Sequence, residues 1–160
     1  MTGENLIRPA RPAEAEQLSE LALRSKGFWG YDAEFLEACR EELSVDANYI
    51  GKHPVYVIEH ETVTAGFYSL EEIDKKEVGL GLLFVEPTYI GNGLGRQLIE
   101  HAKQQAVGAN YETILIQGDP YATHFYLAAG GEPAGTSPSG SISGRMLPLF
   151  RIDLVTADFT

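Results

Sequence analysis

The sequence predicts an α/β protein of the α+β kind, with a mixed central sheet of about six to seven strands flanked by about four helices. Four segments repeat apolar residues at helical spacing, and between them lie short runs rich in β-branched and aromatic residues. Two of these runs are almost wholly apolar and enclose one helix, which predicts parallel strands joined by a right-handed crossover. A chain of 160 residues fits one domain over residues 1–160.

The N-terminal part predicts a short strand and two helices. The strand is indicated by the apolar residues Leu6 and Ile7, and Pro12 then opens an amphipathic segment that stops at Gly27. The next segment, residues 28–43, begins with aromatic residues and continues at helical spacing, with Asp32 as its N-cap. A pair of helices therefore precedes the main run of strands.

From residue 55 the pattern changes to that of a sheet. Residues 55–60 and 63–70 are rich in β-branched and aromatic residues and are separated by Glu61 and Thr62, which predicts a hairpin. Residues 78–85 are almost continuously apolar, as in a central strand covered on both faces, and Pro87 closes the run.

The C-terminal half predicts two more helices and three more strands. Residues 93–107 carry an apolar stripe that ends at Gly108, a suitable C′ residue, and residues 113–117 follow as a buried strand. A short helix is expected within residues 121–131. A turn-rich stretch over 135–145 then leads into strand-like residues 146–155, so the chain should end in a hairpin with a long loop.

Composition excludes several classes of function. A net charge of −11 argues against nucleic acid as a partner, because such binding depends on basic side chains. No apolar run is long enough for a membrane helix or a signal peptide, so we expect a cytoplasmic protein with no membrane partner. The single cysteine, Cys39, cannot form an intramolecular disulfide. The four histidines show no metal-ligand spacing, which predicts that no metal is bound.

Three glycines, Gly91, Gly93 and Gly95, stand between the apolar strand and the helix that follows it. This geometry suits an anion, because backbone N–H groups and the helix N-terminus can face it. A nucleotide P-loop is excluded, since no lysine followed by Ser or Thr comes after Gly95, and a dinucleotide fingerprint would need glycine where Arg96 or Leu98 stands. A tight turn with no ligand is the structural alternative.

The segment "YIGNGLGRQLIEHA" resembles the pyrophosphate loop of the GCN5-related N-acetyltransferase (GNAT) superfamily, whose pattern is Q/R-x-x-G-x-G/A. Ile90 takes the first position, where the family has Gln or Arg, and Gly93 and Gly95 match the glycines. "DPYATHFYLAAGG" is similar to the family's N-x-x-A-x-x-x-Y-x-x-x-G-F, with Gly131 in place of Phe. The order of elements agrees with the family over nearly the whole chain.

The resemblance implies acetyl-CoA as co-substrate and a set of residues that bind it. In the family, two parallel strands diverge and the pantetheine arm lies between them, with the diphosphate on the glycine loop. The coenzyme-binding residues so implied are Leu83, Phe84 and Val85 on the strand, Ile90, Gly91, Asn92, Gly93, Leu94, Gly95 and Arg96 in the loop, and Asp119 and Ala122 further on.

The resemblance also implies a catalytic acid. Transfer to an amine needs a neutral nitrogen and then a proton for the departing thiolate. Tyr126 stands at the family's tyrosine position and is the candidate acid, with a packed helix aromatic as the alternative. Glu77 and Glu86 are candidate bases, although each is also a plausible solvated carboxylate at a strand end, and a water chain is a third option.

An aromatic segment marks the expected acceptor site. Phe28, Trp29 and Tyr31 lie between the first two helices, where the family borders its acceptor, and could hold an apolar or cationic molecule or simply pack the turn. Arg145 could meet an acceptor carboxylate or a coenzyme phosphate, or form a surface ion pair.

Together these features predict an N-acetyltransferase that moves an acetyl group from acetyl-CoA to a primary amine of a small or amino-acid-like molecule, by direct attack in a ternary complex. The expected state is a monomer or a homodimer. The alternative is a non-catalytic acyl-CoA-binding or sensor domain of the same fold.

Overall fold

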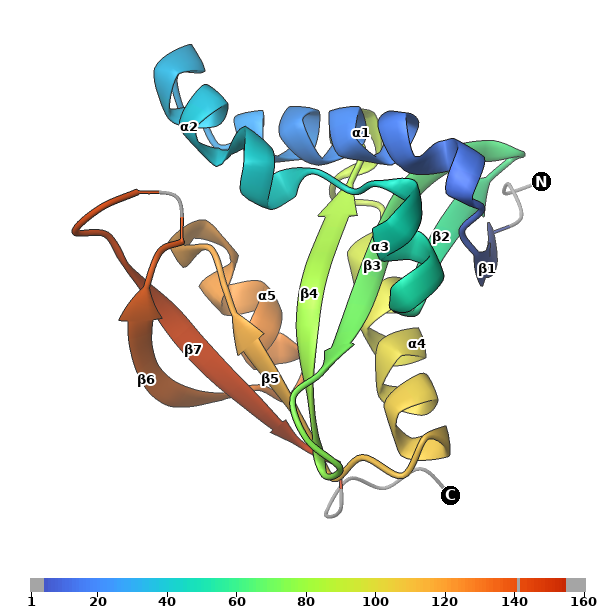
Figure 1. The fold of residues 1–160 in the computed structure, drawn as a ribbon, viewed down its shortest axis with the longest axis vertical. Helices are drawn as coiled ribbons and strands as arrows, with labels where there is room; N and C mark the ends of the chain where they lie inside the picture. The colour runs from blue at the N-terminus through green and yellow to red at the C-terminus, as the bar shows by residue number, and fades with distance from the viewer. Residues whose placement is uncertain (1–4, 141, 155–160) are drawn as a thin grey trace.

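The computed structural model describes residues 5–140 and 142–154 and contains one seven-stranded sheet (Figure 1). Its strand order is β1-β2-β3-β4-β5-β7-β6, and every neighbouring pair is antiparallel except β4 and β5. The strands are β1 (Asn5–Pro9), β2 (Val55–His60), β3 (Val63–Glu72), β4 (Glu77–Val85), β5 (Thr113–Gln117), β6 (Glu132–Pro138) and β7 (Met146–Asp153).

Five α-helices cover the two faces of the sheet, so the described part of the chain has three layers (Figure 1). Alternate residues of one strand face opposite layers: Val57 packs with α1, α2 and α3, whereas Ile58 packs with α4 and α5. The helices are α1 (Ala15–Gly27), α2 (Ala33–Leu43), α3 (Ala47–Lys52), α4 (Leu94–Gly108) and α5 (Thr123–Ala128).

The predicted hairpin between β2 and β3 forms as the sequence indicates. Glu61 and Thr62 both adopt positive φ values, 50° and 70°, and make the two-residue turn. A one-residue register shift between Ile58 and Glu59 follows the turn, and beyond it Val57 lies opposite Phe67 with both side chains in the layer of α1.

The parallel pair β4 and β5 is short, and this decides where a ligand can enter. The two strands pair from Glu77 with Thr113 to Leu80 with Ile116, and no further pair follows. Beyond Leu80, β4 continues to Val85 beside β3 alone. Figure 1 shows the two strands diverging, with α1 and α2 across the open end.

Three details differ from the sequence prediction. Helix α3 was not predicted; its N-cap Asp46 accepts a hydrogen bond from the Tyr49 amide. Helix α4 includes Gly108, and Asn110, with φ 70°, takes the left-handed conformation that we expected at Gly108. The last strand ends at Asp153, and Val155 lies outside the described residues.

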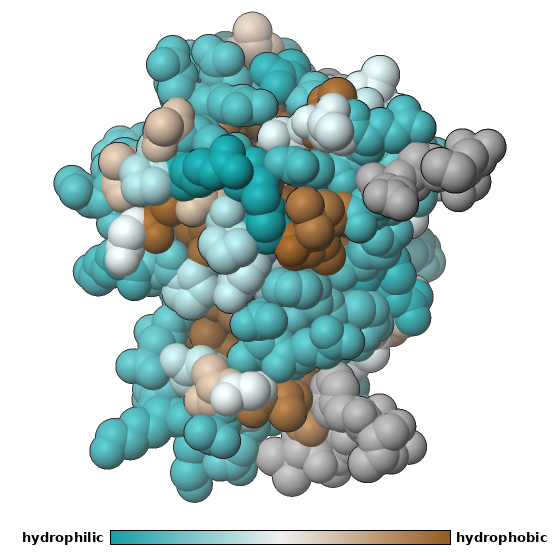
Figure 2. Space-filling model, turned by 90° about the vertical axis from the view of Figure 1, so that its right-hand side faces the viewer, coloured by the Kyte–Doolittle hydropathy of each residue, from teal (hydrophilic) through white to brown (hydrophobic). Residues whose placement is uncertain are grey.

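Figure 2 shows the molecule from the side of β1 and α4, where hydrophilic side chains cover most of the surface and hydrophobic ones form small, separate patches. Among the described helices, none combines the length and the apolar character needed to span a membrane.

Candidate active site

A cavity of about 690 Å³ opens where β4 and β5 diverge. Its walls come from β4, the glycine loop, the start of α4, the turn after β5, and the end of α1. Most of the predicted site residues line it, whereas Asn92, Phe28 and Tyr31 are not among the described residues that do. The predicted residues in its wall are Trp29, Leu83, Phe84, Val85, Ile90, Gly91, Gly93, Leu94, Gly95, Arg96, Asp119, Ala122 and Tyr126.

The glycine loop presents unpaired backbone donors at this cavity. Gly91 and Gly93 have φ values of 94° and 80°, which favour glycine, so both are needed for the path of the loop. The first hydrogen bond of α4 runs from the Gln97 amide to the Gly93 carbonyl. The amides of residues 94–96 come before it and therefore have no acceptor within the helix. None of the side chains that the structure describes caps this end of the helix. A bound anion could accept these donors.

Contacts with neighbouring side chains account for the residue types at Gly95, Ile90 and Arg96. A Cβ atom on Gly95 would lie 3.1 Å from the Phe125 ring, so the glycine allows α4 to pack against α5. Ile90 packs against the core cluster that contains α4, which gives an apolar side chain a role where the family pattern has Gln or Arg. Arg96 is exposed and forms an ion pair with Glu100 at 3.2 Å.

Tyr126 lies on α5 and is 7% exposed. Its ring packs against the Phe150 ring, with centroids 5.5 Å apart, and lies 3.0 Å from where a Cβ atom on Gly118 would be. Burial, with a contribution from the charge of Asp119, raises the pKa of Tyr126 well above its ordinary value. The hydroxyl therefore keeps its proton at neutral pH.

Gly131, which departs from the family pattern, is explained by close packing. A Cβ atom there would lie 2.8 Å from the Tyr126 carbonyl oxygen and 3.3 Å from Phe150 Cβ. A phenylalanine would therefore require this part of the structure to shift.

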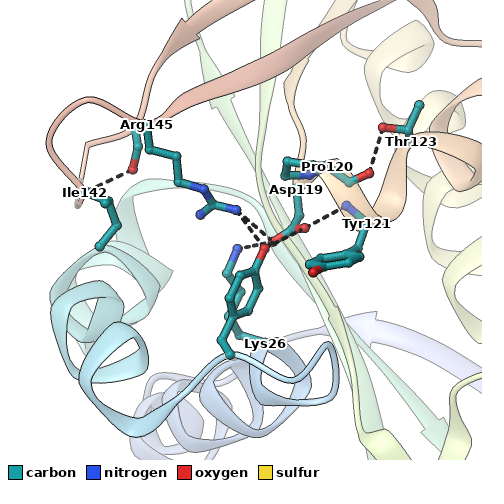
Figure 3. A network of polar contacts seen from close by, with 9 residues as sticks. Lys26, Asp119, Pro120, Tyr121, Thr123, Ile142 and Arg145 are labelled. Atoms are coloured by element: carbon teal, nitrogen blue, oxygen red, sulfur yellow. Dashed lines mark hydrogen bonds and ion pairs between the residues drawn. The ribbon is translucent and has the colours of Figure 1, made fainter.

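Asp119 is the centre of a polar network that joins three segments (Figure 3). Its carboxylate accepts hydrogen bonds from Lys26 Nζ at 2.5 Å and from the Tyr31 hydroxyl at 3.0 and 3.1 Å. Arg145 donates to the Tyr31 hydroxyl at 2.7 Å and lies 3.8 Å from the carboxylate. Burial opposes ionisation, but the Lys26 bond and the Tyr121 amide outweigh it and hold the pKa of Asp119 below its usual value.

An aromatic wall, formed by Phe28, Trp29, Tyr31 and Tyr121, stands beside this network. The rings of Trp29 and Tyr121 are parallel within 6°, with centroids 5.6 Å apart, and the two residues are 37% and 58% exposed. Phe28 meets Trp29 edge to face, and Tyr31 meets Tyr121 in the same way. Trp29 and Tyr121 line the cavity. Tyr121 was not predicted, because only folding brings the turn after β5 to the end of α1.

A second polar cluster, missed from the sequence, is formed by Tyr49 of α3 and by Ser69 and Glu71 of β3, and lies over Gly81 of β4. The Tyr49 hydroxyl is 2.8 Å from Ser69 Oγ and donates to Glu71 Oε2 at 2.5 Å. A Cβ atom on Gly81 would come within 2.8 Å of all three groups, so the glycine makes room for them. Burial, followed by the bond to Glu71, raises the pKa of Tyr49 above its ordinary range, so its hydroxyl acts as the donor.

The two carboxylates predicted as candidate bases lie elsewhere. Glu86 accepts two hydrogen bonds of 2.8 Å from Arg24, and Glu77 is 3.8 Å from Arg151. Neither is among the described residues that line the cavity. Within residues 5–140 and 142–154, no group of three or more His, Cys, Asp or Glu side chains could hold a metal ion.

Residues 14–137 match the family described as "Acetyltransferase (GNAT) domain". The chain is also 29% identical over 147 residues to the 5-NmdU N-acetyltransferase of Pseudomonas phage PaMx11, which covers 91% of this chain and 97% of the relative.

Solved structures show the same fold. A GCN5-related N-acetyltransferase from Rhodopseudomonas palustris has a TM-score of 0.78 and 18% identity, covering 96% of this chain and 98% of the other. The PaiA N-acetyltransferase of Thermoplasma acidophilum, solved with coenzyme A, has a TM-score of 0.77 and 18% identity, and the match covers 94% of this chain and 99% of the other. The acetyltransferase YncA of Salmonella typhimurium, solved with acetyl-CoA, has a TM-score of 0.69 and 19% identity, covering 94% of each chain.

Proposed function

Because the chain belongs to the GNAT acetyltransferase family and is an acetyl-CoA-dependent N-acetyltransferase, we propose that its acceptor is a primary amine of a small or amino-acid-like molecule. The amine attacks the thioester directly while both substrates are bound. The observation that carries this proposal is the cavity at the divergence of β4 and β5, which joins an uncapped helix N-terminus to an aromatic wall.

The coenzyme would occupy the part of the cavity between β4 and α4. The edge of Leu83–Val85 that β5 leaves unpaired suits the amide groups of an extended chain, much as a neighbouring strand would. The diphosphate would accept hydrogen bonds from the backbone amides of Leu94, Gly95 and Arg96. Arg96, exposed at the same end of α4, adds a positive charge.

Tyr126 is proposed as the acid that protonates the departing thiolate. It lines the cavity, and its raised pKa keeps the hydroxyl protonated at neutral pH, so a proton is available to the sulfur as the carbon–sulfur bond breaks.

The acceptor is proposed to enter from the side of α1. Trp29 and Tyr121 line the cavity, and aromatic rings favour a flat apolar group or an ammonium group. Phe28 and Tyr31 support these two rings from outside the cavity wall.

A thiol-release assay tests the proposal directly. The acceptor panel contains 5-NmdU, benzylamine, tyramine, putrescine, spermidine, free amino acids and a peptide with a free N-terminus, and titration calorimetry measures acetyl-CoA binding in parallel. Saturable binding together with thiol release by a small amine is expected.

Two other outcomes would contradict the proposal in different ways. Saturable acetyl-CoA binding with no thiol release for any amine would favour the sensor domain. Turnover with the peptide alone would replace the small acceptor by a protein N-terminus.

A further inference from the structure

We propose that Glu71 is the general base that removes a proton from the acceptor amine. This inference rests on the proposed acetyl transfer and adds a residue that the sequence pattern does not indicate. The geometry that carries it is the meeting of Tyr49, Ser69 and Glu71 above Gly81, at the point where β4 and β5 separate.

The position of Gly81 places the cluster at the reacting end of the cavity. Leu80 is the last residue of β4 that pairs with β5, and Gly81 follows it immediately. On the other strand, Gly118 comes two residues after the last paired residue, Ile116, and the Tyr126 ring packs on it. One glycine on each strand thus makes room for an ionisable side chain, a carboxylate at β4 and a phenol at β5.

Tyr126 and the pair of Tyr49 and Glu71 approach the gap between β4 and β5 from opposite faces of the sheet. Tyr126 belongs to the core cluster of α4 and α5, whereas Tyr49 packs against the cluster of α1, α2 and α3. Trp29, at the end of α1, reaches the cavity from this second side. An amine that enters along α1 therefore meets Glu71 before it reaches the thioester.

A hydrogen bond from Tyr49 holds the Glu71 carboxylate in place at the cavity. The Tyr49 hydroxyl keeps its proton and donates a hydrogen bond to Glu71 Oε2, and Oγ of the fully buried Ser69 lies 2.8 Å from the same hydroxyl. His53 also lies beside this cluster, with its ring centroid 4.6 Å from that of Tyr49, and Glu42 lines the same cavity.

The other carboxylates near the cavity are less suited to this step. Asp119 already accepts bonds from Lys26, Tyr31 and a backbone amide, and Glu86 is held by both nitrogens of the Arg24 fork.

The step balances in atoms and charge. The Glu71 carboxylate takes one proton from the ammonium group, and the neutral nitrogen then attacks the thioester carbonyl carbon. As the carbon–nitrogen bond forms and the carbon–sulfur bond breaks, Tyr126 gives its proton to the thiolate sulfur. The nitrogen releases its second proton, which restores Tyr126, and Glu71 returns its proton to solvent.

The neighbouring residue provides a matched control. Glu72 also accepts a hydrogen bond from a tyrosine hydroxyl, that of Tyr111 at 2.6 Å, and it is exposed outside the cavity. Glu71→Gln and Glu72→Gln therefore make the same chemical change on adjacent residues of one strand.

The test compares these variants on the panel amine that the wild-type enzyme acetylates fastest. For Glu71→Gln, kcat at pH 7 should fall about 100-fold or more, with the acetyl-CoA Kd unchanged within about twofold. The deficit should narrow as the pH approaches 10, because the amine then loses its proton without help. Glu72→Gln should match the wild type.

Three results would overturn the assignment. These are equal activity of the two variants, a Glu71→Gln deficit that stays constant from pH 7 to 10, and a loss of acetyl-CoA binding that accounts for the whole deficit. If the wild type acetylates no amine in the panel, the proposed function itself fails. If the wild type is active and Glu71→Gln is equally active, only the assignment of Glu71 as the base fails.

Tyr49→Phe keeps the test open should Glu71→Gln fail to fold. It removes the hydroxyl that holds the carboxylate at the cavity, so kcat at pH 7 should fall about tenfold, with a deficit that narrows as the pH approaches 10 and an unchanged acetyl-CoA Kd. Wild-type turnover by Tyr49→Phe would contradict the role of Glu71.

Discussion

The Lys26 ammonium lies 2.5 Å from Asp119 Oδ2 and thereby ties the last turn of α1 to the turn after β5, across the open end of the gap between β4 and β5. Both side chains are largely buried. The ion pair therefore links α1, which packs against β4, to the turn after β5, on the side where β4 and β5 do not pair.

Replacing Lys26 with Met should lower the free energy of unfolding by about 1–3 kcal/mol, because a largely buried carboxylate loses a charged donor. Urea unfolding at pH 7 measures this. The matched control is Glu37→Gln, which breaks the exposed ion pair with Arg40 and should change stability by less than about 0.5 kcal/mol. Equal effects of the two variants would mean that the Lys26 pair does not hold these segments together.

Replacing Tyr126 with Phe should lower kcat about 100-fold or more and leave the acetyl-CoA Kd unchanged within about twofold. The ring and its packing against Phe150 remain, and only the proton donor is lost. Tyr111→Phe, which removes an exposed hydroxyl bonded to Glu72, is the control. Turnover equal to that of Tyr111→Phe would remove the acid role.

Replacing Gly93 with Ala should raise the acetyl-CoA Kd about tenfold. An alanine at φ 80° costs about 1–2 kcal/mol, and relief of that strain would turn the loop amides away from the diphosphate. Gly108→Ala is the control, because Gly108 closes the same helix at a site with open space and no positive φ. Calorimetric titration that gives one Kd for both variants would contradict a binding role for the loop.

Replacing Trp29 with Leu should raise the acceptor KM several-fold while kcat and the acetyl-CoA Kd change little. The substitution removes a ring that faces Tyr121 in the cavity and keeps an apolar side chain. Tyr111→Leu changes an aromatic residue that neither lines the cavity nor belongs to the aromatic wall, and serves as the control. An acceptor KM unaffected by Trp29→Leu would move the acceptor site elsewhere.

The stability of the fold should fall as the pH drops below about 6.5. Burial lowers the pKa of His101, whose Nδ1 lies 2.6 Å from the Tyr68 hydroxyl. The folded state thus holds fewer protons than the unfolded state, and stability present above pH 6.5 is lost as the pH falls through the lower folded value. Urea unfolding between pH 7 and pH 5.5 should show a slope of at most about 1.4 kcal/mol per pH unit, and His101→Gln should reduce it.

The elements of the fold were largely predictable because local signals agree with their final places. The Asp32 cap, the Glu61–Thr62 turn and the apolar runs of β4 and β5 each form as predicted. Helix α3 was missed because six residues are too few to show a helical period, although Asp46 is a recognisable N-cap.

The candidate site was only half visible in the sequence, and the difference has a physical cause. The glycine loop and Tyr126 lie in continuous motifs, so spacing alone draws attention to them. Glu71 meets Gly81 only through the register shift between β3 and β4, and Tyr121 meets Trp29 only through the fold. Contacts between residues so far apart in the chain leave no local pattern to recognise.

The four residue pairs that join β4 to β5 have a consequence beyond catalysis. A molecule that lies in the gap would hold together two parts of one sheet. A ligand that binds only the folded state raises the free energy of unfolding by about 2.7 kcal/mol when its concentration is a hundred times Kd. Resistance to heat and to proteases should therefore rise and fall with the supply of acetyl-CoA. The lifetime of the enzyme would then depend on the concentration of the acetyl-CoA that it consumes.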